Sequence, residues 1–144
     1  MPIQTAICAT FKQEDLRGVH VLDADILKMA LIKTAPAGTL DGSLTNYSDL
    51  GADEVVGTGY TAGGETLTNV TVALDGDKSV VDFDDPEWGP AATISARGCL
   101  IYNASKGNAA IAVYDFGDDI GVTNGTFIVR VPEATATTAI LRLN

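Results

Sequence analysis

The sequence predicts an all-β domain, an antiparallel β-sandwich of jelly-roll type with a short N-terminal helix. Within residues 57–103, a glycine-rich lead-in is followed by a run with apolar residues at alternate positions, a turn and a continuous apolar run. Alternation gives a strand one face for the core, and glycine permits the turns between strands. Strand-like runs then recur about every twelve to fifteen residues without a helical pattern between them, which is typical of sandwiches and barrels. Because 144 residues is the size of one domain, we expect residues 1–144 to form a single β-sandwich.

The first expected element is a short helix within residues 5–16. Thr10 can cap its N-terminus, with a capping-box partner three residues later, and Gly18 supplies the stop. A helix of about two turns is marginal on its own in water. We therefore expect it to dock Phe11 and Leu16 either on its own sheet or on a neighbouring subunit.

The next two segments are an apolar run and a long loop. Residues 25–33 predict a strand buried on both faces, although a run this short also fits a helix. Residues 34–54 carry the Pro, Gly, Asp and Asn residues of a loop. A loop of this length usually carries an interaction or contains a short helix, and Tyr47 and Leu50 could anchor it. We expect contacts with another subunit in this loop.

A β-hairpin follows and carries the clearest local signal. Two alternating runs, residues 65–74 and 79–83, flank a strong turn signal at residues 75–78. Trp88, the only tryptophan, is interpreted as a core anchor between the sheets or as a plug in an interface. Further strands are expected at residues 94–103, 109–116, 126–131 and 138–143.

Five segments spread along the chain carry a resemblance to a known family. They are residues 10–14 (Thr-Phe-Lys-Gln-Glu), 57–64 (Gly-Thr-Gly-Tyr-Thr-Ala-Gly-Gly), 82–88 (Asp-Phe, four residues, Trp), 96–103 (Ala-Arg-Gly-Cys-Leu-Ile-Tyr-Asn) and 134–141 (Ala-Thr-Ala-Thr-Thr-Ala-Ile-Leu). In this order they resemble a family of small virion structural proteins of tailed bacteriophages. The resemblance implies a particle component, a head decoration or cement protein, and it offers no catalytic residues to carry over. It also favours the strand over the helix for residues 25–33.

The net charge of −10 is concentrated in one part of the sequence. Residues 41–87 hold eleven acidic residues against a single base, Lys78, and the rest of the chain is neutral. An acidic field repels phosphate backbones, so we expect no direct binding to DNA or RNA. The acidic segment is either a solvated face or a surface complementary to a basic patch on a partner, such as a shell protein.

Side chains suited to catalysis or metal binding are few. A Ser-His-Asp triad would have to use His20, the only histidine, but no Gly-x-Ser-x-Gly elbow is present, and we expect a surface histidine. Cys8 and Cys99 have apolar or small neighbours, which predicts inert buried thiols rather than a disulfide or a metal site. The acids from Asp75 to Glu87 are the best candidate for a cation, but their spacing does not match a calcium loop. We therefore expect no enzyme activity, no cofactor and no metal.

These observations predict a protein that works by binding neighbours in a large assembly. We expect it on the outer head surface of a phage, bound to the major capsid protein, with self-association into dimers or trimers. The N-terminus lacks a signal-peptide pattern, and no apolar run is long enough to span a membrane, so we expect synthesis in the host cytoplasm. The side chains expected at the interface are Phe11, Leu16, Tyr47, Leu50, Tyr60 and Trp88.

Two alternative functions fit the same sequence. A tail or baseplate protein would belong to the same kind of particle in a lower copy number. A carbohydrate-binding module would use exposed aromatic side chains near acids, and Tyr47, Tyr60 and Trp88 could form its platform.

Overall fold

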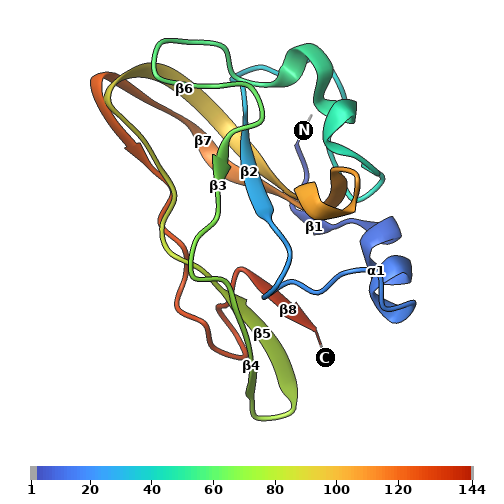
Figure 1. Cartoon of the computed structure of the whole chain (residues 1–144). Coiled ribbons are helices and arrows are strands. Elements are labelled where there is room, and N and C mark those ends of the chain that lie inside the picture. Colours follow the sequence, from blue (N-terminus) through green and yellow to red (C-terminus); the bar gives the residue numbers. More distant parts are fainter. Residues whose placement is uncertain (1–2, 144) are drawn as a thin grey trace.

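Two antiparallel β-sheets and a short N-terminal helix form the part of the chain that the computed structural model describes, residues 3–143 (Figure 1). This arrangement confirms the predicted all-β sandwich with an N-terminal helix. No helix within residues 3–143 has the length and apolar character needed to cross a membrane. The elements are β1 (Ala6–Ile7), α1 (Ala9–Leu16), β2 (Leu27–Ile32), the 3₁₀ helix η1 (Tyr47–Asp53), β3 (Glu65–Thr66), β4 (Thr71–Asp75), β5 (Lys78–Asp82), β6 (Glu87–Asn103), the 3₁₀ helix η2 (Ala104–Lys106), β7 (Ala109–Ile128) and β8 (Leu141–Leu143).

The larger sheet has the strand order β1-β7-β6-β2-β3 and is built on the long hairpin of β6 and β7. β2 pairs with the C-terminal part of β6, from Leu27 opposite Asn103 to Ile32 opposite Gly98. Every residue of β2 except Lys28 is buried, because both of its faces pack against other parts of the chain. The predicted strand at this position is therefore confirmed, and the helical alternative is excluded.

The smaller sheet, β4-β5-β8, lies at one end of the molecule (Figure 1). β4 and β5 pair without interruption from Thr71 opposite Asp82 to Asp75 opposite Lys78, which leaves a two-residue turn where the sequence predicts it. Gly76, at the first position of this turn, has a φ of 65°. A type II′ turn needs a positive φ there, and glycine adopts it without steric cost.

The predicted strand at residues 65–74 is wrong as a single element, because it is divided between the two sheets. β3 pairs with β2, whereas β4 begins at Thr71 and pairs with β5. Between them, Asn69 has a φ of 54°, in the left-handed region that Asn enters more easily than β-branched residues. This single backbone reversal leaves the alternation of Thr and Val unchanged, so the pattern does not reveal it.

β6 and β7 are longer than the sequence predicts. The predicted strands at residues 109–116 and 126–131 belong largely to one strand, β7, and β6 already begins at Glu87. The connecting residues 117–125 are rich in Gly, Asp and Asn and resemble turns, yet they continue the ladder with β6 through several register shifts. Backbone pairing holds this exposed part of the hairpin together, so its side chains carry no strand pattern.

α1 begins directly after Cys8, which takes the N-cap position that the sequence assigns to Thr10. Thr10 lies inside the helix, and its buried hydroxyl has no hydrogen-bond partner among the described residues. The predicted stop is confirmed, because the chain leaves the helix through Gly18 with a φ of 73°. Phe11 packs in the core, as one of the two predicted alternatives has it, but Leu16 is 91% exposed and does not dock on its own sheet.

The long loop before β3 contains a short helix, as its length predicts. Asn46 caps η1 by accepting a hydrogen bond from the N–H of Ser48, and Asp49 accepts one from the N–H of Asn46. Leu50 is buried and Tyr47 stacks on Tyr102 with 4.7 Å between the ring centroids. Both side chains therefore anchor the loop, as predicted.

Candidate functional site

Half of the side chains expected at an interface lie inside the protein. Phe11, Leu50 and Trp88 are exposed by 0%, 2% and 1% of their surface, so they pack in this chain's own core and do not face a partner. For Trp88, this selects the core interpretation over the interface plug. The physical reason is size: large apolar side chains gain most from complete burial in a domain with one core. Tyr47 and Tyr60 are half-buried, and Leu16 is fully accessible.

The densest polar arrangement is the Glu54 cluster, in which the carboxylate of Glu54 accepts three hydrogen bonds. The hydroxyl of Tyr47 donates to its Oε1 at 2.5 Å, and the hydroxyl of Tyr60 donates to its Oε2 at 2.6 Å. The N–H of Gly63 donates to the same Oε2 at 2.8 Å. Burial, followed by the bond to Glu54, raises the pKa of both tyrosines above its ordinary value. The cluster therefore holds neutral phenols, which act as donors and not as nucleophiles.

The Glu54 cluster fastens the glycine-rich lead-in to the larger sheet. The Tyr60 hydroxyl also accepts a hydrogen bond from the N–H of Leu31 at 3.0 Å, and the Tyr102 hydroxyl donates to the carbonyl of Gly63 at 2.6 Å. The Tyr60 ring lies 6.3 Å from the ring of Trp88. Because Trp88 is buried and the hydroxyl of Tyr60 points into this network, the proposed sugar platform of exposed aromatic rings does not form.

Gly64 shows how closely the lead-in lies on β2. Its φ is 80°, and a Cβ built there would be 1.8 Å from the carbonyl oxygen of Met29. No side chain fits at that distance, so glycine is required both by conformation and by space. Two signals in the sequence, the glycine pair and Tyr60, thus describe a packed junction between the lead-in and the sheet.

His20 is buried, and the prediction of a surface histidine is wrong. Its side chain has no exposed surface and lies against Phe11, with 4.9 Å between the ring centroids. Nε2 lies 3.1 Å from Glu14 Oε1, and Nδ1 lies 2.9 Å from the side-chain nitrogen of Asn103. The ring closes the gap between α1 and β6, a contact between distant parts of the chain that local sequence does not reveal.

The partners of Asn103 define which ring nitrogen of His20 carries the proton. The Asn103 amide nitrogen donates to Asp25 at 2.7 Å and to His20 Nδ1, while its oxygen accepts from the N–H of Ser105. His20 Nδ1 is thus an acceptor, and Nε2–H donates to Glu14. Burial would raise the pKa of Asp25, but its bonds to Asn103 and to the N–H of Val21 hold this pKa below its usual value. Both ring nitrogens of His20 are engaged in hydrogen bonds, to Glu14 and Asn103, so the ring links α1 to β6 and is not part of a Ser-His-Asp triad.

The acids between Asp75 and Glu87 do not converge. Asp75 accepts a hydrogen bond from the N–H of Ala136, and Asp85 accepts one from the N–H of Val131. Asp84 accepts from the side chains of Thr68 and Asn69. Within residues 3–143, no group of three or more His, Cys, Asp and Glu side chains is placed to hold a metal ion. Asp75 thus ties a loop to β4, and Asp84 and Asp85 tie the segment after β5 to other loops, roles that the charge pattern does not indicate.

Both cysteines are free thiols inside the protein, as predicted. Cys8 and Cys99 have exposed fractions of 0% and 1% and form no disulfide. Burial, with nearby Asp41 and Asp49, raises the pKa of Cys8 to about 11, and burial raises that of Cys99 to about 12. A thiolate is therefore disfavoured at both positions, which makes them unreactive near neutral pH.

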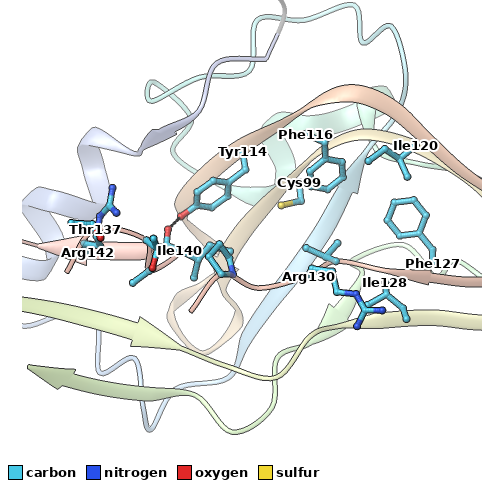
Figure 2. A pocket seen from close by; sticks show the side chains of 14 residues that line it. Cys99, Tyr114, Phe116, Ile120, Phe127, Ile128, Arg130, Thr137, Ile140 and Arg142 are labelled. Carbon is cyan, nitrogen blue, oxygen red and sulfur yellow. Dashed lines mark hydrogen bonds between the residues drawn. The ribbon is translucent and has the colours of Figure 1, made fainter. Parts of the chain in front are cut away.

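A pocket of about 580 Å³ opens between β7 and the segment that leads into β8 (Figure 2). Phe116, Ile120 and Phe127 supply apolar wall, and Arg130 and Arg142 also line it. The hydroxyl of a further wall residue, Tyr114, donates to the backbone carbonyl of Ile140 and joins the two sides. Arg130 also lies 3.5 Å from the carboxylate of Asp85, so the lining is mainly apolar. The residues come from separate segments, so the sequence offers no signal for this pocket.

Two large apolar side chains are almost fully exposed. Leu16 is exposed by 91% at the end of α1, and Val56 by 95% beside the glycine-rich lead-in. Comparison with protein-family models, with curated proteins and with solved structures finds no match to the chain. The accessible apolar side chains and the acidic surface are therefore the features from which a function can be argued.

Proposed function

We propose that this protein is a non-enzymatic component of a bacteriophage particle that binds the major capsid protein on the outer surface of the head. The observation that carries the proposal is the exposure of Leu16 and Val56, at 91% and 95%. Leu16 belongs to the N-terminal helix, where contacts are expected, and Val56 lies between two further segments where contacts are expected, residues 34–54 and the lead-in at residues 57–64. Exposed apolar side chains of this size favour burial against a partner.

The packing of the family-like segments supports the proposal. Residues 57–64 contribute Tyr60, whose ring lies beside Trp88 of residues 82–88. Residues 96–103 contribute Tyr102, whose hydroxyl donates to the carbonyl of Gly63. Three of the five segments thus meet around one junction. The residues on which the resemblance depends are thus in part residues of one packed junction.

The proposed mechanism is mechanical. Each copy would bridge neighbouring shell subunits through an interface of about 1,000 Å² or more in total. A closed symmetric shell repeats this contact many times, so modest affinities add up to resistance against the internal pressure of packaged DNA. The acids of residues 41–87 would steer the protein to a basic surface on the shell, and this attraction would weaken with salt.

A binding experiment with heads that lack the protein tests the proposal. Purified protein is added to such heads, and bound protein is measured by co-sedimentation. Leu16→Lys and Val56→Lys should each weaken binding by about tenfold or more if these side chains are buried in the contact. Ile120→Lys, at a side chain with 46% exposure outside the expected contact regions, is the matched control and should bind normally.

Three outcomes would contradict the proposal: no saturable binding of the wild type, equal binding of all variants, or equal loss in the control. Binding to isolated tails rather than heads would instead support the tail or baseplate alternative, in which the same exposed side chains contact a different partner.

A further inference from the structure

We propose that two copies of this chain pair through the free edge of β4, forming a symmetric dimer with a continuous six-stranded sheet. β4 is an edge strand of the smaller sheet, and all five of its residues, from Thr71 to Asp75, are exposed. The other edge strands among residues 3–143, β1, β3 and β8, have only two or three residues each. β4 is thus the longest of these four edge strands; the part of β7 beyond its pairing with β1 also lacks a second neighbour, but it belongs to the two-stranded part of the β6–β7 hairpin.

The backbone of β4 presents unpaired groups at regular intervals. Asp75 and Lys78 flank a two-residue turn, which makes them a hydrogen-bonded pair, and hydrogen-bonded pairs alternate along an antiparallel ladder. The N–H and C=O groups of Val72 and Leu74 therefore point away from β5. In the described chain, no backbone hydrogen bond outside the ladders involves residues 71–75. These four groups are available to a second strand.

Apart from Asp75 at its end, β4 lacks the features that normally protect an edge. Edge strands usually carry Lys, Pro or a bulge that prevents pairing with another chain. β4 reads Thr-Val-Ala-Leu-Asp, and its register with β5 is unbroken. Val72 and Leu74 are 42% and 78% exposed and lie in the same rows as Val81 and Ser79. The edge therefore combines free backbone groups with accessible apolar side chains.

If the partner strand is β4 of a second copy, one register forms more backbone hydrogen bonds than the others. With the two-fold axis between the two Ala73 residues, Val72 of each copy faces Leu74 of the other, and four backbone hydrogen bonds form. If the two-fold axis lies at Val72 or at Leu74 instead, only two backbone hydrogen bonds form. In the Ala73 register, Asp75 lies opposite Thr71 rather than opposite another Asp75, so no acids face each other directly. The self-complementary backbone pattern of this edge, with no acids directly opposed, therefore fits a second copy as the occupant.

A cysteine scan along β4 tests both the pairing and its register. In the Ala73 register, the two Ala73 residues form a non-hydrogen-bonded pair with a Cα–Cα distance of about 4.5 Å, which lies within the range of disulfides. Ala73→Cys should therefore cross-link with oxidised glutathione faster than cysteine substitutions at Thr71, Val72, Leu74 or Asp75. The native thiols, Cys8 and Cys99, are buried and do not compete.

The matched control for random collision is Val56→Cys, at a side chain with 95% exposure that lies outside β4. In a preformed dimer the effective thiol concentration is millimolar, so at about 10 µM protein Ala73→Cys should cross-link on the order of a hundredfold faster than Val56→Cys. A rate equal to that of Val56→Cys, or a maximum at another position of β4, would overturn the proposal.

Sedimentation velocity provides a second test that does not depend on a disulfide. The wild type should sediment as a dimer, and Leu74→Lys should sediment as a monomer with an unchanged circular dichroism spectrum, because Leu74 is 78% exposed. Val56→Lys should remain dimeric. Because each copy carries a charge of −10, added salt should strengthen the dimer. A monomeric wild type would overturn this proposal and leave capsid binding through Leu16 and Val56 untouched.

Discussion

Replacement of Glu54 tests whether its carboxylate holds the lead-in on the sheet. Glu54→Ala removes the acceptor of three hydrogen bonds, from Tyr47, Tyr60 and the N–H of Gly63. Hydrogen bonds to a charged group stabilise a protein by about 1.5–3 kcal/mol each, but partial exposure of Glu54 places these near or below the lower limit. We expect Glu54→Ala to lower the free energy of unfolding by about 3 kcal/mol.

Glu54→Gln is the matched variant, because it keeps the shape and loses only the charge. The amide oxygen can accept from Tyr60 and Gly63, and the hydroxyl of Tyr47 can rotate to accept from the amide nitrogen. The expected loss is about 1 kcal/mol. Urea unfolding followed by the fluorescence of Trp88, the single tryptophan, measures both variants, since the Trp88 ring lies 6.3 Å from that of Tyr60.

The two variants together decide the role of the cluster. A loss below about 0.5 kcal/mol for Glu54→Ala would show that water replaces the carboxylate at no cost. Equal losses for Glu54→Ala and Glu54→Gln would show that charge alone matters. A double-mutant cycle of Glu54→Gln with Tyr60→Phe should give a coupling energy of at least about 0.5 kcal/mol, because the two side chains are in direct contact.

Two further predictions concern a glycine and the buried thiols. Gly64→Ala should lower the free energy of unfolding by more than Gly117→Ala, because both have a φ near 80° but only Gly64 has a backbone atom, Met29 O, where the Cβ would lie. Equal losses in urea unfolding would refute the steric argument. In the folded protein, the pKa values of Cys8 and Cys99 are about 11 and about 12, above the ordinary value of 9.0. The stability that the two neutral thiols contribute is therefore complete below pH 9 and is lost as the pH rises toward those values. Unfolding midpoints should therefore fall above pH 9, and less so in the Cys99→Ala variant; an identical pH profile would contradict this.

Local chemistry in the sequence predicts the hairpin and the buried strand correctly. Gly76 marks a two-residue turn because few residues adopt a positive φ without cost, and the apolar run of β2 indicates burial on both faces. In these cases the physical cause lies within a few neighbouring residues.

Where contacts between distant residues decide the structure, the sequence misleads. Residues 117–125 look like turns, but pairing with β6 extends them as a strand. His20 looks like a surface residue, but Asn103, 83 positions away, supplies the hydrogen bond that permits its burial. Glu54 gives no signal at all, because its role depends on how the lead-in folds back over β2. The candidate contact side chains fail for the same reason: burial of Phe11, Leu50 and Trp88 depends on which faces meet.

The copy number of this protein in purified phage particles tests the central claim most directly. Quantitative mass spectrometry can compare it with the major capsid protein of the same particles. A head decoration protein that binds repeated sites on a closed shell should occur in a fixed ratio to the capsid protein and in a similar order of abundance. Absence from intact particles would contradict the account.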